Sequence, residues 1–179
     1  MVSLVIGGAR SGKSRFAQSL GATARRAFYI ATARREDAEM DARIAEHRRM
    51  RPAHWCTIEV PLDIGDAVER HRLQCDFLLL DCLTVWLSNF CWEHRARPER
   101  DIETAALTEV ARTAATAAEA HVVLVSNEVG GGLVPETTLG RFFRDLQGRV
   151  NQEAARLADE VFLVVAGIPL AIKRTEKSR

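Results

Sequence analysis

The sequence predicts an α/β fold, and three observations predict it. Apolar runs of strand length alternate with helix-like stretches along all 179 residues. Two of the runs, Phe77–Leu80 and Val122–Val125, are apolar without interruption, which is typical of parallel strands buried on both faces of a sheet. A glycine-rich loop with the pattern of a phosphate-binding loop joins the first strand to the first helix. Folds of this class bind their ligands at the carboxyl ends of the strands.

The elements follow one another in a regular order. The expected strands are Ser3–Ile6, Ala27–Ala31, Thr57–Val60, Phe77–Leu80, Val122–Ser126 and Val161–Ala166. The expected helices are Ser14–Arg26, Asp37–Met50, Leu62–Leu73, Leu83–Glu93, Ile102–Ala120 and Leu139–Asp159. No internal repeat, linker or low-complexity segment divides them, so we expect a single domain over residues 1–179.

The glycine-rich loop has the complete G-x-x-x-x-G-K-[ST] pattern, and its residues are Gly7, Gly8, Ala9, Arg10, Ser11, Gly12, Lys13 and Ser14. In such a loop the two outer glycines let the backbone turn tightly and bring its N–H groups to phosphate oxygens. Lys13 would reach the β- and γ-phosphates, and the Ser14 hydroxyl would bind Mg²⁺. A chance match is the alternative, but the strand before the loop and the helix after it favour a nucleoside triphosphate site.

Composition excludes several classes of function. A hydrophobic content of 47% and a charged content of 27% are ordinary for a globular protein, and the net charge of +1 gives no general attraction to nucleic acid or anionic membrane. No apolar stretch approaches the roughly 18 residues of a membrane-spanning helix, and the amino end does not resemble a secretory signal. The four cysteines lack C-x-x-C spacing, so reduced, mostly buried thiols and a cytoplasmic location are expected. The basic cluster at Lys173–Arg179 is expected to be a solvated tail.

Asp81 directly follows an apolar strand, where the second acidic residue of a phosphate-loop nucleotide site usually lies. There it would hold Mg²⁺ or its water shell opposite Ser14. The alternative is an acidic residue that caps the helix beginning at Leu83.

The helix expected over Asp37–Met50 has acidic residues early and arginines late, and Pro52 should end it. His47 shares a face with Met40 and Ile44, so it points inward or into a cleft. An imidazole among arginines suits a nucleophile that carries phosphate, whereas a buried histidine with a satisfied hydrogen bond is the alternative. His54 is a second candidate, in a position more typical of a loop.

The segment Asn127–Pro135 is rich in glycine and follows a buried strand. Glu128 could orient a nucleophile or a metal-bound water there, and the glycines could let the backbone approach a ligand. The segment could equally be a simple connection between a strand and a helix, and the sequence does not decide between the two.

Several motifs in order resemble one enzyme family over nearly the whole chain. They are Gly-Gly-Ala-Arg-Ser-Gly-Lys-Ser at Gly7–Ser14, Tyr-Ile-Ala-Thr at Tyr29–Thr32, Ala-Arg-Ile-x-x-His and Arg-Pro-x-x-Trp within Ala42–Trp55, Asn-Glu-Val-Gly at Asn127–Gly130, Gly-Arg-Val-Asn-Gln at Gly148–Gln152, and Ala-Asp-Glu-Val from Ala158. The set is similar to that of the bifunctional adenosylcobinamide kinase/adenosylcobinamide-phosphate guanylyltransferases of cobalamin biosynthesis.

That resemblance implies a RecA-like P-loop fold, a homotrimer, and the substrates adenosylcobinamide, its phosphate, GTP and ATP, with Mg²⁺. It implies that His47 carries GMP as a covalent intermediate. Some relatives have two adjacent histidines, whereas here Glu46 precedes His47. Besides the loop Gly7–Ser14, the implied nucleotide contacts are Ala31, Thr32, Ala33, Arg48, Arg49, Met50, Arg51, Glu59 and Asp81. The alternatives are a small-metabolite kinase without nucleotidyl transfer and a nucleotide-dependent regulatory module.

Overall fold

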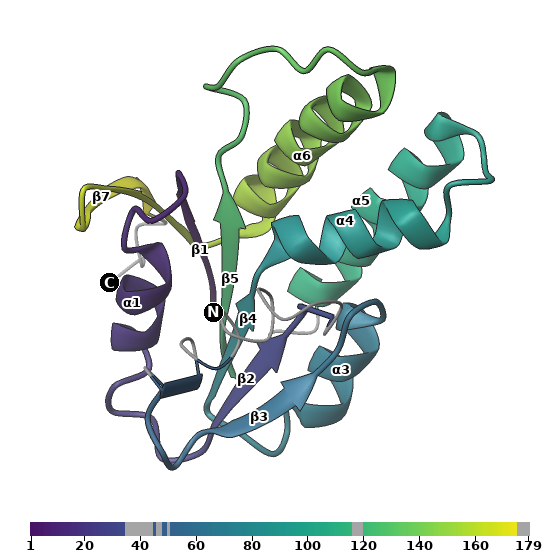
Figure 1. Cartoon of the computed structure of the whole chain (residues 1–179). Coiled ribbons are helices and arrows are strands. Elements are labelled where there is room, and N and C mark those ends of the chain that lie inside the picture. Colours follow the sequence, from purple (N-terminus) through teal and green to yellow (C-terminus); the bar gives the residue numbers. More distant parts are fainter. Residues whose placement is uncertain (35–44, 46–47, 50, 116–119, 175–179) are drawn as a thin grey trace.

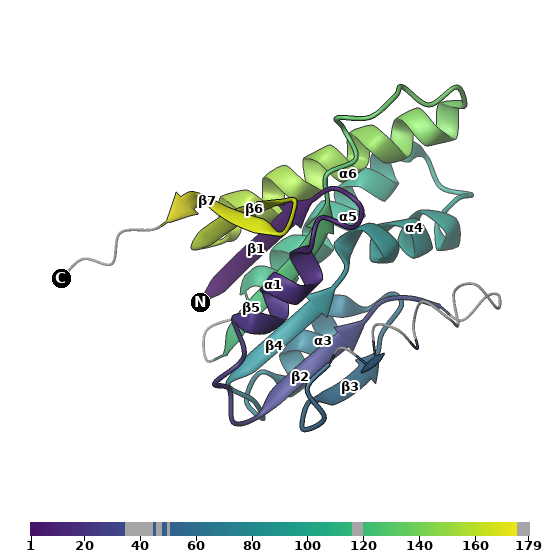
Figure 2. The ribbon, with the colours of Figure 1, turned by 60° about the vertical axis from the view of Figure 1, so that its left-hand side comes forward.

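In the computed structural model, residues 1–34, 45, 48–49, 51–115 and 120–174 are described. Their strands are β1 (Val2–Gly7), β2 (Ala27–Ala31), β3 (Cys56–Glu59), β4 (Phe77–Asp81), β5 (His121–Asn127), β6 (Glu160–Val165) and β7 (Ile168–Arg174). All seven belong to one sheet, in the order β3-β2-β4-β5-β1-β6-β7 (Figures 1 and 2). Every neighbouring pair is parallel except β6 and β7. The first six strands therefore end at the same edge of the sheet.

Helices cover the two faces of this sheet unequally. The described helices are α1 (Lys13–Ser19), α3 (Ile64–His71), α4 (Leu83–Glu93), α5 (Glu99–Ala115) and α6 (Thr138–Leu157). Of these, α1 packs on one face, while α3, α4, α5 and α6 pack on the other (Figure 2). The alternation of side chains along each strand sends one set of apolar residues to each face, which is why the apolar runs are continuous.

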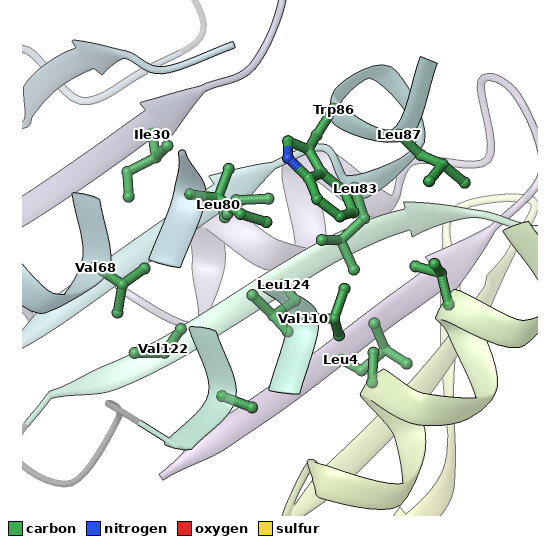
Figure 3. Packing of buried hydrophobic residues seen from close by; sticks show 14 of the residues in the cluster. Leu4, Ile30, Val68, Leu80, Leu83, Trp86, Leu87, Val110, Val122 and Leu124 are labelled. Carbon is green, nitrogen blue, oxygen red and sulfur yellow. The ribbon is translucent and has the colours of Figure 1, made fainter. Parts of the chain in front are cut away.

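The larger core lies between the sheet and the four-helix layer (Figure 3). Leu4, Leu80 and Leu124 contribute from three neighbouring strands, and each is fully buried. Trp86 on α4 packs into the same layer, and its indole N–H donates to the Leu62 carbonyl at 2.7 Å. The core therefore fixes α4, which begins two residues after Asp81.

Most of the sequence-predicted elements are confirmed, but the first helix is shorter than expected. It ends at Ser19, not at Arg26. The chain turns at Gly21, where an added Cβ would lie 2.5 Å from the ring of Phe77. Turn-type hydrogen bonds from Gly21 to Gln18 and from Ala22 to Ser19 replace the helical pattern.

The last strand, β7, is missing from the sequence-based prediction. It pairs antiparallel with β6 through a tight turn at Ala166 and Gly167, both of which have positive φ, 51° and 81°. Pro169 is tolerated because β7 is an edge strand with one neighbour. The expectation that Lys173 belongs to a solvated tail is wrong. Its ammonium donates to the carbonyls of Ala155, Arg156 and Ala158 at the end of α6, which stabilises that helix terminus.

The helix expected over Asp37–Met50 lies mostly outside the described residues. Within it, Ala45, Arg48 and Arg49 are helical. In the part of the chain that is described, no helix has both the length and the apolar character needed to span a membrane.

Candidate nucleotide site

The loop Gly7–Ser14 joins the end of β1 to the start of α1 at the carboxyl edge of the sheet. Gly12 has φ 92°, a left-handed conformation that favours glycine, and α1 begins at the next residue. Lys13 is only 9% exposed, and its ammonium donates to the Gly8 carbonyl at 3.1 Å. The lysine therefore lies back against the loop, in the position from which a P-loop lysine reaches phosphate oxygens.

The turn between β6 and β7 supports this loop from one side. The Gly167 N–H donates to the Ser11 carbonyl at 2.8 Å. A Cβ added to Gly12 would lie 3.1 Å from the Gly167 Cα, and one added to Gly7 would lie 2.5 Å from the Val164 carbonyl oxygen. Close backbone approach thus favours glycine at both positions, and at Gly12 the left-handed conformation favours it as well.

The end of β5 supports the loop from the other side. The Glu128 N–H donates to the Gly7 carbonyl at 3.1 Å, and the Asn127 N–H donates to the Thr84 hydroxyl at 2.8 Å. The Glu128 side chain is exposed, and one of its oxygens accepts from the N–H of Gly130 in its own loop. The backbone of this segment thus ties β5 to the phosphate loop, while the carboxylate of Glu128 faces solvent.

Asp81 is the last residue of β4 and lies at the same edge. The alternative that it caps the following helix is wrong, because Cys82 is the N-cap and its sulfur accepts from the Val85 N–H at 3.5 Å. The Asp81 carboxylate instead accepts a hydrogen bond from the Tyr29 hydroxyl at 2.8 Å. Burial, followed by the charge of Asp81, raises the pKa of Tyr29 well above its ordinary value. The phenol therefore keeps its proton and remains a donor.

Thr32 holds the ends of β2 and β4 together. Its hydroxyl donates to the Cys82 carbonyl and accepts from the Cys82 N–H, both at 2.9 Å. Its carbonyl accepts from the Asn89 amide of α4 at 2.8 Å, and its N–H donates to the Asp81 carbonyl at 3.3 Å. Because these polar groups of Thr32 are paired within the protein, we expect Thr32 to position the flanking residues Ala31 and Ala33.

Arginines from the segment after residue 47 lie beside β3. Arg48 forms an ion pair with Glu59 at 2.7 Å, and both side chains are 46% exposed. The pair contributes at most about 1 kcal/mol to stability at that exposure. Arg51 stacks on the Tyr29 ring, with its guanidinium carbon 3.5 Å from the ring centroid, and donates to the Thr57 hydroxyl at 3.2 Å. Arg49 is exposed.

Two predicted site residues, His47 and Met50, lie outside the described residues, and their roles stay predictions. His54 lies in an exposed turn, as its context indicated. The phosphate loop, Ala31–Ala33 and Asp81 lie at the carboxyl edge, and Glu59, which pairs with Arg48, lies there next to Ala31. Arg51 lies over Tyr29 on β2.

Tyr29 and Gly167 contact site residues but were not predicted from the sequence. Tyr29 offered one signal, because it lies two residues before Ala31 on a predicted strand and therefore shares its face. Gly167 offered none, since β7 was not predicted.

The oxygen donors suit a hard cation bound together with a nucleotide. Ser14 supplies a hydroxyl from the first turn of α1, and Asp81 supplies a carboxylate. Mg²⁺ commonly takes one or two such protein ligands and completes its shell with phosphate oxygens and water. Among the described residues, no group of three or more His, Cys, Asp or Glu could hold a metal unaided.

The four cysteines are free thiols, which fits the absence of C-x-x-C spacing. Three are buried and Cys56 is exposed. Burial raises the pKa of Cys82 to about 12 and that of Cys91 to about 11, so both buried thiols stay protonated and unreactive.

Sequence comparison finds close relatives over the full length. A sequence model of the family described as cobinamide kinase / cobinamide phosphate guanyltransferase matches residues 3–172. The chain is 44% identical to the bifunctional adenosylcobalamin biosynthesis protein CobU of Salmonella typhimurium, over 97% of this chain and 100% of that protein. It is 42% identical to CobU of Escherichia coli, with the same coverage. It is 43% identical to CobP of Pseudomonas aeruginosa, over 97% of this chain and 98% of that protein.

Solved structures of similar fold come from distant proteins. An ATPase from a type III secretion system of pathogenic bacteria superposes with a TM-score of 0.62 at 11% identity, over 95% of this chain and 56% of that one. The ATPase EscN of an enteropathogenic E. coli type III secretion system gives 0.55 at 12% identity, over 92% and 43%. At this identity the likeness shows the fold alone, and it confirms the expected RecA-like P-loop fold.

Proposed function

The chain belongs to the cobinamide kinase / cobinamide phosphate guanyltransferase family, and on that basis we propose that this enzyme catalyses two successive reactions of cobalamin biosynthesis. In the first, a nucleoside triphosphate phosphorylates the hydroxyl of adenosylcobinamide. In the second, GMP passes from GTP to adenosylcobinamide phosphate, which gives adenosylcobinamide-GDP and pyrophosphate. From the resemblance we also propose a cytoplasmic homotrimer.

One observation supports the proposal most directly. The phosphate loop and Asp81 lie at the carboxyl edge of the sheet, after β1 and at the end of β4, with β5 between these two strands. Arg51 stacks on the ring of Tyr29, whose hydroxyl donates to Asp81. A triphosphate bound along this edge would meet Lys13 at one end and the arginine segment at the other. Such a site has groups for chemistry at both the γ- and the α-phosphorus.

In the kinase reaction, the acceptor oxygen of the corrinoid forms a bond to the γ-phosphorus. The bond from that phosphorus to the β-bridging oxygen breaks, the nucleoside diphosphate leaves, and the hydroxyl proton passes to solvent or a base. Lys13 and the loop N–H groups would stabilise the charge that develops on the leaving phosphate. No covalent intermediate is needed, because positioning and electrostatics supply most of the catalysis of phosphoryl transfer.

Ser14 and Asp81 would hold Mg²⁺ when the nucleotide is bound, since a hydroxyl and a carboxylate at this edge match its preference for oxygen ligands. The ion would supply charge neutralisation at the β- and γ-phosphates. The same two residues serve both reactions, because both use the triphosphate site.

In the guanylyl reaction, a nitrogen of neutral His47 forms a bond to the α-phosphorus of GTP. The bond to the α,β-bridging oxygen breaks and pyrophosphate leaves. A phosphate oxygen of the corrinoid then attacks the same phosphorus, the P–N bond breaks, and the imidazole is restored. The P–N linkage divides one difficult exchange into two displacements. Arg48 and Arg51 would neutralise charge at the phosphates during these steps.

The test is to follow GTP labelled on the α- or the γ-phosphorus. With α-labelled GTP we expect the chain to acquire an acid-labile, alkali-stable label, which His47→Ala abolishes while part of the kinase activity persists. A label retained by His47→Ala, or no label on a folded wild-type chain, would refute the guanylyl assignment. Transfer of the γ-label alone to the corrinoid would indicate a kinase without nucleotidyl transfer. Nucleotide hydrolysis at the same rate with and without corrinoid would indicate a regulatory module.

A further inference from the structure

Tyr29 contacts two predicted site residues, Asp81 and Arg51, and has no role in the function proposed so far. It is the single tyrosine of the chain and is 1% exposed. On β2 it lies in register with Thr57 of β3 on one side and Leu79 of β4 on the other. Its side chain belongs to the face of the sheet that α1 covers. A phenol at this position can contact groups on both neighbouring strands.

The hydroxyl of Tyr29 contacts Asp81, the last residue of β4. Asp81 lies two residues beyond Leu79, so it shares the same face one step closer to the carboxyl edge. The hydroxyl donates to the Oδ2 atom of Asp81 at 2.8 Å. A donor at this distance restrains the carboxylate through Oδ2 and leaves Oδ1 outside this hydrogen bond. Residues that orient a metal-binding carboxylate in this way set its affinity although they never touch the metal.

The ring of Tyr29 contacts the guanidinium of Arg51. The guanidinium carbon of Arg51 lies 3.5 Å from the ring centroid, and its Nη1 atom donates to the Thr57 hydroxyl at 3.2 Å. A guanidinium that stacks on an aromatic ring holds its N–H groups in its own plane, where they can still donate hydrogen bonds. The position of Arg51 is therefore set by the same side chain that sets the orientation of Asp81.

We propose that Tyr29 is a positioning residue for both reactions: its hydroxyl orients Asp81 toward the nucleotide-bound cation, and its ring seats Arg51 beside the phosphates. This inference rests on the proposed function, in which Asp81 binds Mg²⁺ and Arg51 binds the nucleotide. The two contacts are chemically separable, because Tyr29→Phe removes the hydroxyl and keeps the ring, whereas Tyr29→Leu removes both.

The first test measures Mg²⁺ dependence of nucleotide binding. Isothermal titration calorimetry follows binding of the α,β-methylene analogue of GTP, whose α-phosphorus cannot lose pyrophosphate, in EDTA and over a series of Mg²⁺ concentrations. For Tyr29→Phe we expect the half-saturating Mg²⁺ concentration to rise roughly 10-fold, with affinity in EDTA unchanged. For Tyr29→Leu we expect affinity in EDTA to weaken as well, by roughly 2- to 30-fold, as loss of a cation–π contact predicts.

Two controls separate positioning from a general loss of stability. Ser3→Ala removes another fully buried hydroxyl, which contacts His121 Nε2 at 2.9 Å at the opposite edge of the sheet, and it should leave the Mg²⁺ dependence unchanged. In an Asp81→Asn background, Tyr29→Phe should have no additional effect, because its hydroxyl acts through that carboxylate. If Tyr29→Phe and the wild type require the same Mg²⁺ concentration while Asp81→Asn requires more, the inference is wrong. If Asp81→Asn has no effect either, the proposed metal site itself is wrong.

A spectroscopic measurement gives a readout that does not depend on affinity. Since Tyr29 is the only tyrosine, incorporation of 3-fluorotyrosine gives a single ¹⁹F resonance from the folded protein. We expect this resonance to shift when Mg²⁺ is added to the protein with the α,β-methylene analogue already bound. The shift should disappear in Asp81→Asn. If the chemical shift does not change when Mg²⁺ is added to the otherwise wild-type protein, the result would contradict the contact between Tyr29 and the cation site.

Discussion

Alanine substitutions at Gly7 and Gly8, the first two residues of the phosphate loop, should differ in their effect on stability. The structure gives the size of that difference. Gly7 and Gly8 are adjacent, and each would gain one methyl group on substitution by alanine. At Gly7 the new Cβ would lie 2.5 Å from the backbone oxygen of Val164 and 2.6 Å from the Ser11 hydroxyl, whereas at Gly8 nothing lies within 4 Å. Both substitutions reduce the entropy of the unfolded chain similarly, by about 0.4–1 kcal/mol in favour of folding. The difference between the two variants therefore isolates the packing cost at Gly7.

The size of that cost follows from the contact. A carbon and a carbonyl oxygen approach to about 3.3 Å at the closest, so β1 and β6 must separate by about 0.8 Å at this point. The Ser11 hydroxyl can rotate away, but the Val164 carbonyl belongs to the sheet and cannot. Overpacking of this kind costs about 1–3 kcal/mol. We therefore expect the free energy of unfolding of Gly7→Ala to be lower than that of Gly8→Ala by about 1–3 kcal/mol. In urea titrations, Gly7→Ala should unfold at the lower urea concentration.

The same displacement should reduce activity. A shift approaching 1 Å in groups that position a substrate can lower the rate about 100-fold, and it would move the loop relative to both phosphorus atoms. Assays with α- and γ-labelled GTP should therefore show both transfers falling together in Gly7→Ala. A difference of less than about 0.5 kcal/mol between Gly7→Ala and Gly8→Ala lies within the ordinary scatter of surface substitutions. That result would show that the close approach of Gly7 to Val164 does not limit stability.

Three further predictions use other parts of the molecule. Lys13→Ala should lower kinase and guanylyl transfer rates together, roughly 100-fold or more, and normal rates in either labelled assay would show that the lysine does not serve the triphosphate. Thiol titration at pH 8 should modify the exposed Cys56 at once, while Cys82, with its pKa raised to about 12 by burial, reacts only on unfolding; fast modification of two or more thiols in the native protein would contradict this. Burial lowers the pKa of His121 in the folded protein. The contribution of neutral His121 to stability is therefore complete above the unfolded-state pKa of about 6.5. It is lost as the pH falls through the lower pKa of the folded state. Urea unfolding between pH 7.5 and 5 should show this loss, and His121→Asn should reduce it; an equal slope in the variant would assign the loss to other groups.

Much of the fold could be predicted from the sequence because local and tertiary preferences agree in it. The runs Phe77–Leu80 and Val122–Val125 are strand formers that are buried on both faces, so propensity and burial predict the same element. Agreement fails at β7. Its Pro169 is unfavourable in a strand, and only the edge position, which depends on the whole sheet, makes that proline acceptable.

The site could be predicted in part for a related reason. The phosphate loop is recognisable because its contacts with phosphate are made by one short segment, so their spacing is fixed along the chain. The contacts around Tyr29 join residues 22 and 52 positions away, Arg51 and Asp81. Such contacts depend on which strands are neighbours and in which register. No local pattern contains that information, and the strand order β3-β2-β4 supplies it.

Register also explains which polar strand ends face the phosphate loop. Side chains alternate along each strand, and the apolar residues Leu79 of β4 and Val125 of β5 pack on the face that α1 covers. Asp81 and Asn127, two residues further along, continue the same face to the carboxyl edge. Glu128 comes one residue later, beyond the strand, and its carboxylate is exposed. Counting in steps of two from the buried residues therefore separates Asp81 from Glu128, although both are acidic residues near the carboxyl end of a strand. A slip of β4 by one residue would turn Asp81 toward the layer of Trp86 and leave the loop without its acidic partner.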